Sequence, residues 1–471
     1  MKLWREWWSI VIQLRPAFLR QRTFLWFAVA VAGMSIRSDL RGITGIVRAW
    51  GLVGSCYDRL LDMFHSPAVR VDHLAALWTQ VVLRVLKPFL TTFNGRIILV
   101  CDGIKVAKSG KKMPAVKKLH QQSESNTKPE YIFGHSCQAV AVLAGTGQTV
   151  FALPLIARIH EGPKFTNRDR RTQLDHLVAM VAGLEVGLPF YLLGDAYYAT
   201  RTMIGGVLKS GQHLITAVRS NAVAHEPAAP RPEKPGRGAP RKSGKKVYLR
   251  DLHSSPDAID IASPLAGEKD VVIRCVVRKL YWKSADAVVL FVAANHPTRG
   301  KKIFLSTDTT LKLEDILRAY GLRFKIEVGF KQAVHTIGVF AYHFWMRAMT
   351  PRPKKSGDQY LHKKPEAYRG MVKRKMHAYH VHMQAGVIAQ GIAQILAITC
   401  PKLVWKHFGS WIRTIREGIL PSEQVTVLAL RNTLPEFLAD SSDEPILAEF
   451  VKEKIDLSRA EGLRMVYSNS A

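Results

Sequence analysis

Paired cysteines are absent from this sequence. It has five cysteines, an odd number, and no Cys-x-x-Cys motif: Cys56, Cys101, Cys137, Cys275 and Cys400. This pattern excludes a disulfide scaffold or a zinc ribbon, and dispersed thiols are typical of proteins in a reducing cytosol. We therefore expect a cytoplasmic protein whose fold depends on a hydrophobic core rather than on crosslinks.

Long hydrophobic runs are also missing. The apolar segment from Leu25 to Ile36 is shorter than the roughly 20 residues that a membrane-spanning helix needs, and Arg37 follows it directly. We expect a buried helix there, and no membrane-spanning segment. Hydrophobic residues nevertheless make up 47% of the 471 residues. This excludes a disordered chain and leaves room for two to four domains.

Acidic residues are scarce. The chain has 68 lysines and arginines against 37 aspartates and glutamates, a formal net charge of +31, and its pI is about 10.1. Such an excess points to a polyanionic partner, with nucleic acid first and an anionic membrane surface as the rival.

The apolar pattern divides the chain into five regions. Residues 1–95 have helical spacing and predict a helical DNA-binding domain, with a plain structural bundle as the alternative. Residues 96–222 alternate short β-branched runs with an amphipathic helix, which indicates the first part of an α/β catalytic domain. Residues 223–304 predict a basic tether and a β-rich insertion, and 305–348 return to α/β. Residues 349–471 predict a basic helical region, with helices at 383–398 and 410–420 and an acidic tail.

Two apolar runs each end in an aspartate. Residues 96–102 read RIILVCD and residues 190–195 read FYLLGD. Both runs are too short for helices and read as buried strands. If these strands are parallel neighbours, Asp102 and Asp195 emerge at the end of the sheet where α/β proteins bind ligands. Taken alone, each aspartate is more often a turn or cap residue.

A third carboxylate follows on a predicted helix. Tyr320, Arg323 and Glu327 are spaced by three and four residues, so on one continuous helix they fall within an arc of about 60°. Pairs of Arg and Glu at this spacing are common on exposed helices. Apolar neighbours indicate a helix packed on two sides: Ile316, Leu317, Phe324 and Ile326.

Three carboxylates suit a particular chemistry. Mg²⁺ prefers oxygen ligands, and three carboxylates can hold two ions about 3.5–4 Å apart. One ion activates water or a 3′-hydroxyl, and the other stabilises the leaving oxygen of a phosphodiester. A nearby arginine and tyrosine can hold a phosphate by charge-assisted hydrogen bonds. We therefore expect two Mg²⁺ ions, with Mn²⁺ as the substitute.

With these residues identified, the sequence resembles the DDE transposases of bacterial insertion sequences, in the branch marked by Tyr-x2-Arg-x3-Glu-x6-Lys. Tyr320, Arg323 and Glu327 match that spacing, and Tyr198 follows the second aspartate in the expected context. The order of parts also matches: Asp, Asp, β-rich insertion, Glu helix. The resemblance is good over residues 96–350 and looser at both ends.

The resemblance implies an α/β, RNase H-like fold with a mixed five-stranded sheet, a β-rich insertion and helical flanks. It implies that Asp102 bridges two metal ions and that Asp195 and Glu327 each complete one. Such an enzyme binds transposon terminal inverted repeats in double-stranded DNA, hydrolyses the ends and joins the freed 3′-hydroxyls to target DNA. Relatives act as homodimers on paired ends. The expected location is the bacterial cytoplasm, in association with the nucleoid.

The sequence departs from the family pattern at two positions. The signature lysine would fall at Val334, and Lys331, one turn after Glu327, is the candidate replacement. In the basic tether at 236–242, Ala239 stands where a minor-groove-reading hook would have arginine. The remaining basic residues of the tether are candidate DNA contacts: Arg237, Arg241 and Lys242.

Other side chains are also candidate DNA contacts. Trp282, in the insertion, is a candidate for stacking an extruded base, with a strand-core tryptophan as the alternative. Lys111 and Lys112 are candidates for phosphate contacts, with a solvated loop as the alternative. Three closely spaced histidines lack the further ligand of a metal site and fit a helix surface facing phosphates: His377, His380 and His382.

The leading interpretation is a cut-and-paste DNA transposase. Two alternatives stay open: a non-catalytic DNA-binding protein derived from such an enzyme, and another RNase H-like nuclease such as a resolvase. The three carboxylates argue against the first, and the insertion together with the Tyr320–Arg323–Glu327 face argues against the second. A membrane-surface protein is disfavoured, because no strongly amphipathic basic terminal helix stands out.

Overall fold

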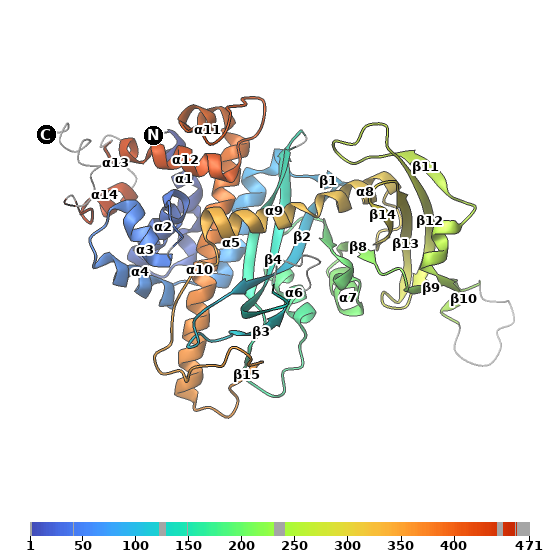
Figure 1. Ribbon diagram of the computed structural model, residues 1–471, viewed down its shortest axis with the longest axis horizontal. Helices are drawn as coiled ribbons and strands as arrows, with labels where there is room; N and C mark the ends of the chain where they lie inside the picture. Colours follow the sequence, from blue (N-terminus) through green and yellow to red (C-terminus); the bar gives the residue numbers. More distant parts are fainter. Residues whose placement is uncertain are drawn as a thin grey trace.

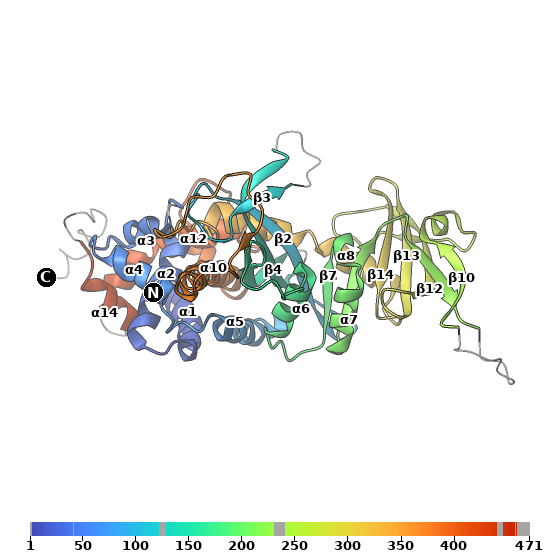
Figure 2. The same cartoon turned by 90° about the horizontal axis from the view of Figure 1, so that it is seen from below.

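The computed structural model describes residues 2–40, 42–121, 129–147, 149–229, 241–439, 446–456 and 458. These residues form an elongated molecule, with a helical block at one end, a sheet in the middle and a β-rich block at the other end (Figures 1 and 2). The first and last helices, α1 (Lys2–Val11) and α14 (Ile446–Lys452), lie together in the helical block.

Both predicted helical regions contribute to that block. The N-terminal region continues with α2 (Gln21–Ile36), α3 (Gly42–Trp50), α4 (Cys56–His65) and α5 (Val71–Val85). The C-terminal region adds α10 (Glu366–Thr399), α11 (Pro401–His407), α12 (Glu423–Asn432) and α13 (Leu434–Ala439). α10 packs against α2, α4, α5 and α12, so the two ends of the chain share one core.

The two most apolar helices are buried inside the protein. The helix predicted at 25–36 is α2, which is buried from Phe24 onward. α10 is long and apolar enough to cross a membrane by length and composition, but its apolar stretch is completely buried. Gly391 brings α10 against α5, because a Cβ atom there would lie only 2.3 Å from the indole of Trp78. α10 is therefore the central core helix.

The helix predicted at 410–420 is absent, and that prediction is wrong. The segment is an irregular loop between α11 and α12. Its large apolar side chains are exposed: Trp411, Ile412, Ile415 and Ile419. A short helix in a protein is stabilised mainly by packing its apolar face, and this segment packs no such face against the core.

The predicted five-stranded mixed sheet is present in the middle of the molecule (Figure 1). Its strands are β2 (Arg96–Ala107), β4 (Tyr131–Thr146), β5 (Thr149–Ile159), β7 (Phe190–Gly194) and β8 (His213–Val218). They lie in the order β5-β4-β2-β7-β8, with β4 antiparallel to both of its neighbours and β7 and β8 parallel to β2. This is the arrangement expected of an RNase H-like domain.

β2 is the central strand and is buried on both faces over its first half. Leu99 and Cys101 contribute to the core shared with the helical block, together with α6 (Gln173–Ala182) and α7 (Arg201–Lys209). Ile98 and Val100 contribute to a second core beneath α8 (Leu313–Leu322) and α9 (Lys325–Gln332). Burial on both faces explains why this run is almost continuously apolar. Alternation along the strand then turns Asp102 toward α9.

The predicted β-rich insertion follows β8. Its strands are β9 (Val223–Pro227), β10 (Ser243–Tyr248), β11 (Ile259–Ala262), β12 (Val272–Trp282), β13 (Ala287–His296) and β14 (Gly300–Ser306). β14 pairs antiparallel with β8, so the insertion extends the central sheet. The chain then passes through α8 and α9 back toward the helical block (Figure 1).

Candidate active site

The two predicted aspartates lie level on neighbouring strands. β2 and β7 are paired in parallel, with Val100 opposite Leu193, and Asp102 and Asp195 each lie two residues further along. Asp102 remains within β2, whereas Asp195 follows β7 and precedes the 3₁₀ turn Ala196–Tyr198. The predicted parallel pairing is confirmed, and it brings both carboxylates to the same end of the sheet.

Hydrogen bonds fix the backbone around Asp195. Its carboxylate accepts from the N–H of Tyr197 at 2.9 Å, and its carbonyl accepts from the hydroxyl of Thr216 at 2.6 Å. The hydroxyl of Tyr198 accepts from Nε2 of Gln138 at 2.6 Å. Thr216 belongs to β8 and Gln138 to β4, so strands on both sides of the β7–β2 pair hold the turn that carries Asp195.

The region predicted as one helix carrying Tyr320, Arg323 and Glu327 is two helices, and that prediction is wrong. α8 ends at Leu322 and α9 begins at Lys325. Between them, the N–H of Arg323 bonds to the carbonyl of Tyr320, and the N–H of Glu327 to that of Phe324. These bonds reach back three residues, as in a 3₁₀ turn. Arg323 and Phe324 keep right-handed helical dihedrals, so a tight two-residue turn joins α8 to α9.

Arg323 lies in this turn and joins the first and third candidate carboxylates. Its Nη1 donates to Oδ2 of Asp102 at 3.2 Å, and its Nη2 donates to Oε1 of Glu327 at 2.5 Å. The Arg323 and Asp102 side chains are 17% and 21% exposed, and Glu327 is 41% exposed. Because water is largely excluded around Arg323 and Asp102, their ion pair is stronger than a surface one.

Burial and neighbouring charges set the state of Asp102. Burial raises the pKa of Asp102 to about 6, and the nearby charges of Asp195 and Glu327 act in the same direction. The Gly103 N–H, which donates to Oδ1 at 2.7 Å, and the Arg323 charge lower the pKa but do not cancel the effect of burial. A carboxyl perturbed by burial and by two further carboxyls is typical of a functional site.

The donor set fits a divalent cation in kind, because carboxylate oxygens are the ligands that Mg²⁺ and Mn²⁺ prefer. The carboxylates, however, do not surround a common metal position. Within the described ranges, no three metal-ligating side chains are close enough together to hold an ion. Arg323 instead lies between Asp102 and Glu327. An ion that used both carboxylates would have to displace the guanidinium.

The other members of the predicted helical stripe lie beside this site. Tyr320 is half-buried, with its ring 4.7 Å from that of Phe304. Lys331 is exposed in the last turn of α9. Val334 lies in the π-helical turn Ala333–Ile337 and packs against the core. The position of the family lysine is therefore on the packed side of the chain, and Lys331 is on the solvent side.

The remaining candidates lie further from the carboxylates in sequence. Trp282 is only 8% exposed and packs edge-on against Phe291 in the insertion, as a strand-core tryptophan would. Lys111 and Lys112 are exposed, and Lys112 donates to the carbonyl of Arg347. Of the tether residues, Lys242 pairs with Asp286 at 2.8 Å, Arg241 is exposed, and Arg237 lies outside the described residues. Their DNA contacts stay predictions.

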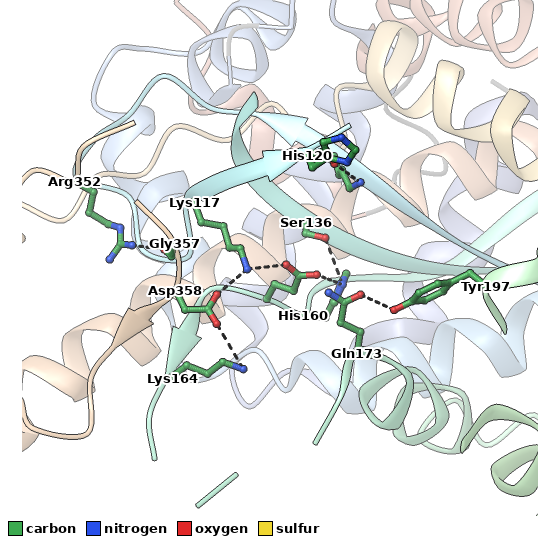
Figure 3. Close-up of polar contacts among 12 residues, drawn as sticks. Lys117, His120, Ser136, His160, Lys164, Gln173, Tyr197, Arg352, Gly357 and Asp358 are labelled. Atoms are coloured by element: carbon green, nitrogen blue, oxygen red, sulfur yellow. Dashed lines mark hydrogen bonds and ion pairs between the residues drawn. The ribbon is translucent and has the colours of Figure 1, made fainter. Parts of the chain in front are cut away.

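Motif spacing alone misses two features near the site. Gln138 and Thr216 hold the Asp195 turn, but nothing in their sequence context marks them. The loop 163–172, which reads PKFTNRDRRT, carries four basic residues and one acid. The excess of positive charge in this loop is visible in the sequence. The loop leads into α6, whose first residue, Gln173, accepts through Oε1 from the hydroxyl of Tyr197 at 3.2 Å, next to the site (Figure 3).

A comparison with protein families identifies the chain. The family model for the DDE superfamily endonucleases matches residues 13–264, more than half of the sequence. The chain belongs to the DDE superfamily endonucleases. The matched range includes Asp102 and Asp195 and ends before Glu327, so it does not extend to the third candidate carboxylate of this DDE endonuclease.

A search of the curated proteins finds no match. Among solved structures, a cryo-EM structure of the piggyBac transposase synaptic complex with hairpin DNA is similar over 92% of this chain and 76% of that chain. The two are 10% identical with a TM-score of 0.37.

Proposed function

We propose that this DDE superfamily endonuclease is a DNA transposase. It binds the ends of a transposon, cleaves them by two-metal phosphodiester hydrolysis and joins the 3′-hydroxyls to target DNA. The observation that carries the proposal is that Asp102 and Asp195 lie level at one end of an RNase H-like sheet, with Arg323 linking Asp102 to Glu327. The expected partners are double-stranded DNA and a second copy of the chain on paired ends.

Each side chain has a role in this proposal. Asp102, Asp195 and Glu327 would together hold two Mg²⁺ or Mn²⁺ ions. When bound, the ions would activate the oxygen nucleophile and stabilise the leaving oxygen. Once Arg323 is free of the carboxylates, it and Tyr320 can bind a phosphate next to the scissile bond, and Lys331 supplies a further cation.

The test is a cleavage and joining assay. A plasmid carries the inverted repeats that flank the gene, and the purified chain is added with Mg²⁺. We expect excision and strand transfer by the wild type, and DNA binding without cleavage by Asp102→Asn, Asp195→Asn and Glu327→Gln. Asp315→Asn, a carboxylate on the outer side of α8, serves as the matched control and should stay active.

The alternatives give different results. Cleavage without joining would indicate another nuclease, and binding without cleavage by the wild type would indicate a non-catalytic DNA-binding protein. Normal cleavage by Asp102→Asn would remove the metal assignment.

A further inference from the structure

A wide groove lies on the face of the sheet opposite to Asp102, between the end of β5, α6 and the N-terminal half of α10. Its volume is about 780 Å³. Basic side chains and histidines line it: Arg158, His160, Lys164, Arg171, His176, Lys373 and His380. We call it the basic groove. Gln138 also lines it and donates to the hydroxyl of Tyr198, in the turn that follows Asp195.

The first bank of the basic groove is the loop 163–172, between β6 (Pro163–Lys164) and α6. Arg168 and Arg170 are exposed, and in the described part of the chain neither has an ion-pair partner. Asp169, the only acid of the loop, is held by Arg171 through two hydrogen bonds of 2.9 and 2.6 Å. The loop therefore presents free positive charge along the rim.

The second bank is the N-terminal half of α10. Lys373 is exposed on it and lies 5.6 Å from the ring centre of Phe165, which belongs to the first bank. Three more cations are exposed on or just before this half of the helix: Lys363, Lys364 and Arg374. Of these exposed cations, Lys373 lines the groove and the others lie outside its lining. The contact of Lys373 with Phe165 brings the two banks together.

The acidic groups near the groove are paired with cations. Lys117 contacts both Glu161, at 2.9 Å, and Asp358, at 2.7 Å, and Lys164 lies 3.9 Å from Asp358. Figure 3 shows the contacts of Asp358. Asp72 pairs with Arg158 at 3.4 Å. Among the described residues that line the groove, four lysines and arginines stand against two aspartates, so the excess charge is positive.

Two histidines line the groove with a buried nitrogen that has no hydrogen-bond partner among the described residues: His160, through Nδ1, and His380, through Nε2. Gln173, at the end of the first bank, contacts Tyr197 two residues after Asp195 (Figure 3). A ligand lying in the groove would therefore extend toward the candidate active site.

We propose that the basic groove holds the phosphate backbone of the DNA that flanks the cleavage site, so that the strand leaves the active site between the loop 163–172 and α10. Exposed cations spread over the loop and the helix suit a repeating polyanion better than a single small phosphate. Continuity with the Asp195 turn ties this DNA to the reacting strand. The inference rests on the proposed function, because it takes DNA as the substrate.

The test compares two variants with equal charge loss. The groove variant combines Arg168→Gln, Arg170→Gln and Lys373→Gln. The control combines Lys209→Gln, Lys402→Gln and Lys406→Gln, which are exposed cations outside both the region 1–95 and the groove lining. Binding of a fluorescein-labelled 30-base-pair duplex that contains the flanking inverted repeat is followed by anisotropy between 50 and 300 mM salt, on the order of the range over which counterion release is measured.

We expect the wild type and the control to share one salt slope. The groove variant should lose about 0.9 from that slope for each phosphate contact removed, a total of two to three, and bind roughly tenfold or more weakly at 150 mM salt. Equal weakening of both variants, or an unchanged slope for the groove variant, would overturn the proposal. Loss of binding to anionic phosphatidylserine vesicles, with DNA binding intact, would also overturn it in favour of a membrane.

Failure of this proposal is distinguishable from failure of the proposed function. If the wild type cleaves and joins DNA while the groove variant binds it normally, only the groove assignment fails. If the wild type binds no duplex at all, the function fails with it. Should the triple variant misfold by circular dichroism, Arg168→Gln alone, in an exposed loop, provides the same comparison with Lys402→Gln.

Discussion

The guanidinium of Arg323 occupies the position between Asp102 and Glu327 that a bridging cation would need. Replacing it by Arg323→Gln should therefore strengthen the binding of a divalent ion in the absence of DNA. In the wild type, an ion that uses both carboxylates must first break the bonds of 3.2 and 2.5 Å. In the variant, both carboxylates are available from the start.

The size of the effect follows from those bonds. A hydrogen bond to a charged group contributes about 1.5–3 kcal/mol. The bond to Asp102 retains most of this value because both side chains are about a fifth exposed, whereas the bond to Glu327, which is 41% exposed, retains little. Release of Asp102 alone gives about 1.5–3 kcal/mol, or roughly ten- to hundredfold in Kd.

Isothermal titration of Mn²⁺ into DNA-free protein measures this change. The titration is done at pH 8, because the pKa of Asp102 is about 6 in the wild type and the loss of the Arg323 charge raises it further. Arg318→Gln is the matched control, since Arg318 lies on α8 five residues before Arg323 and pairs with Asp315. Tighter binding by Arg323→Gln alone supports the reasoning. Unchanged or weaker binding, or an equal gain in the control, refutes it.

Three further predictions concern stability and positioning. Burial alone would raise the pKa of Glu161, but hydrogen bonds from His160 and Lys117 lower it to about 2. Its stabilisation, about 3 kcal/mol, is present above pH 4.5 and lost as the pH falls toward 2, so Glu161→Gln should lower the free energy of urea unfolding at pH 6 but not at pH 2. Thr216→Val should weaken Mn²⁺ binding and slow cleavage with a loss of about 1 kcal/mol in stability, whereas Thr216→Ser should retain both. Gly391→Ala should cost about 1–3 kcal/mol in thermal unfolding by overpacking the core, with DNA binding of the folded protein unchanged.

The sheet and the strand-end aspartates were predictable because burial on both faces leaves a clear mark. The runs RIILVCD and FYLLGD have few polar residues before the aspartate, and a central parallel strand must be apolar on both sides. Their lateral order was not in the pattern itself, and came from the family resemblance. Gln138 and Thr216, which hold the Asp195 turn, are ordinary strand residues whose roles depend on contacts far along the chain.

The break between α8 and α9 was not predictable from periodicity. The spacing of Tyr320, Arg323 and Glu327 fits one straight helix, and no proline marks the break. Periodicity also predicted too much helix at 410–420, where helical spacing exists but the large apolar side chains are exposed. Periodicity reports which residues share a face, whereas a helix in a protein persists only where that face is packed.

The backbone after α9 explains why the family lysine can be missing at position 334. On a straight helix, Lys331 and Val334 both lie near the stripe of Glu327, four and seven residues further on. The chain widens into a π-helical turn at Ala333, where Val334 packs against the core. A lysine there would have to bring its ammonium past that packing, whereas Lys331 is exposed and one turn nearer to Glu327. The geometry therefore favours position 331 as the source of the cation, and the site can lack a lysine at 334 without lacking its charge.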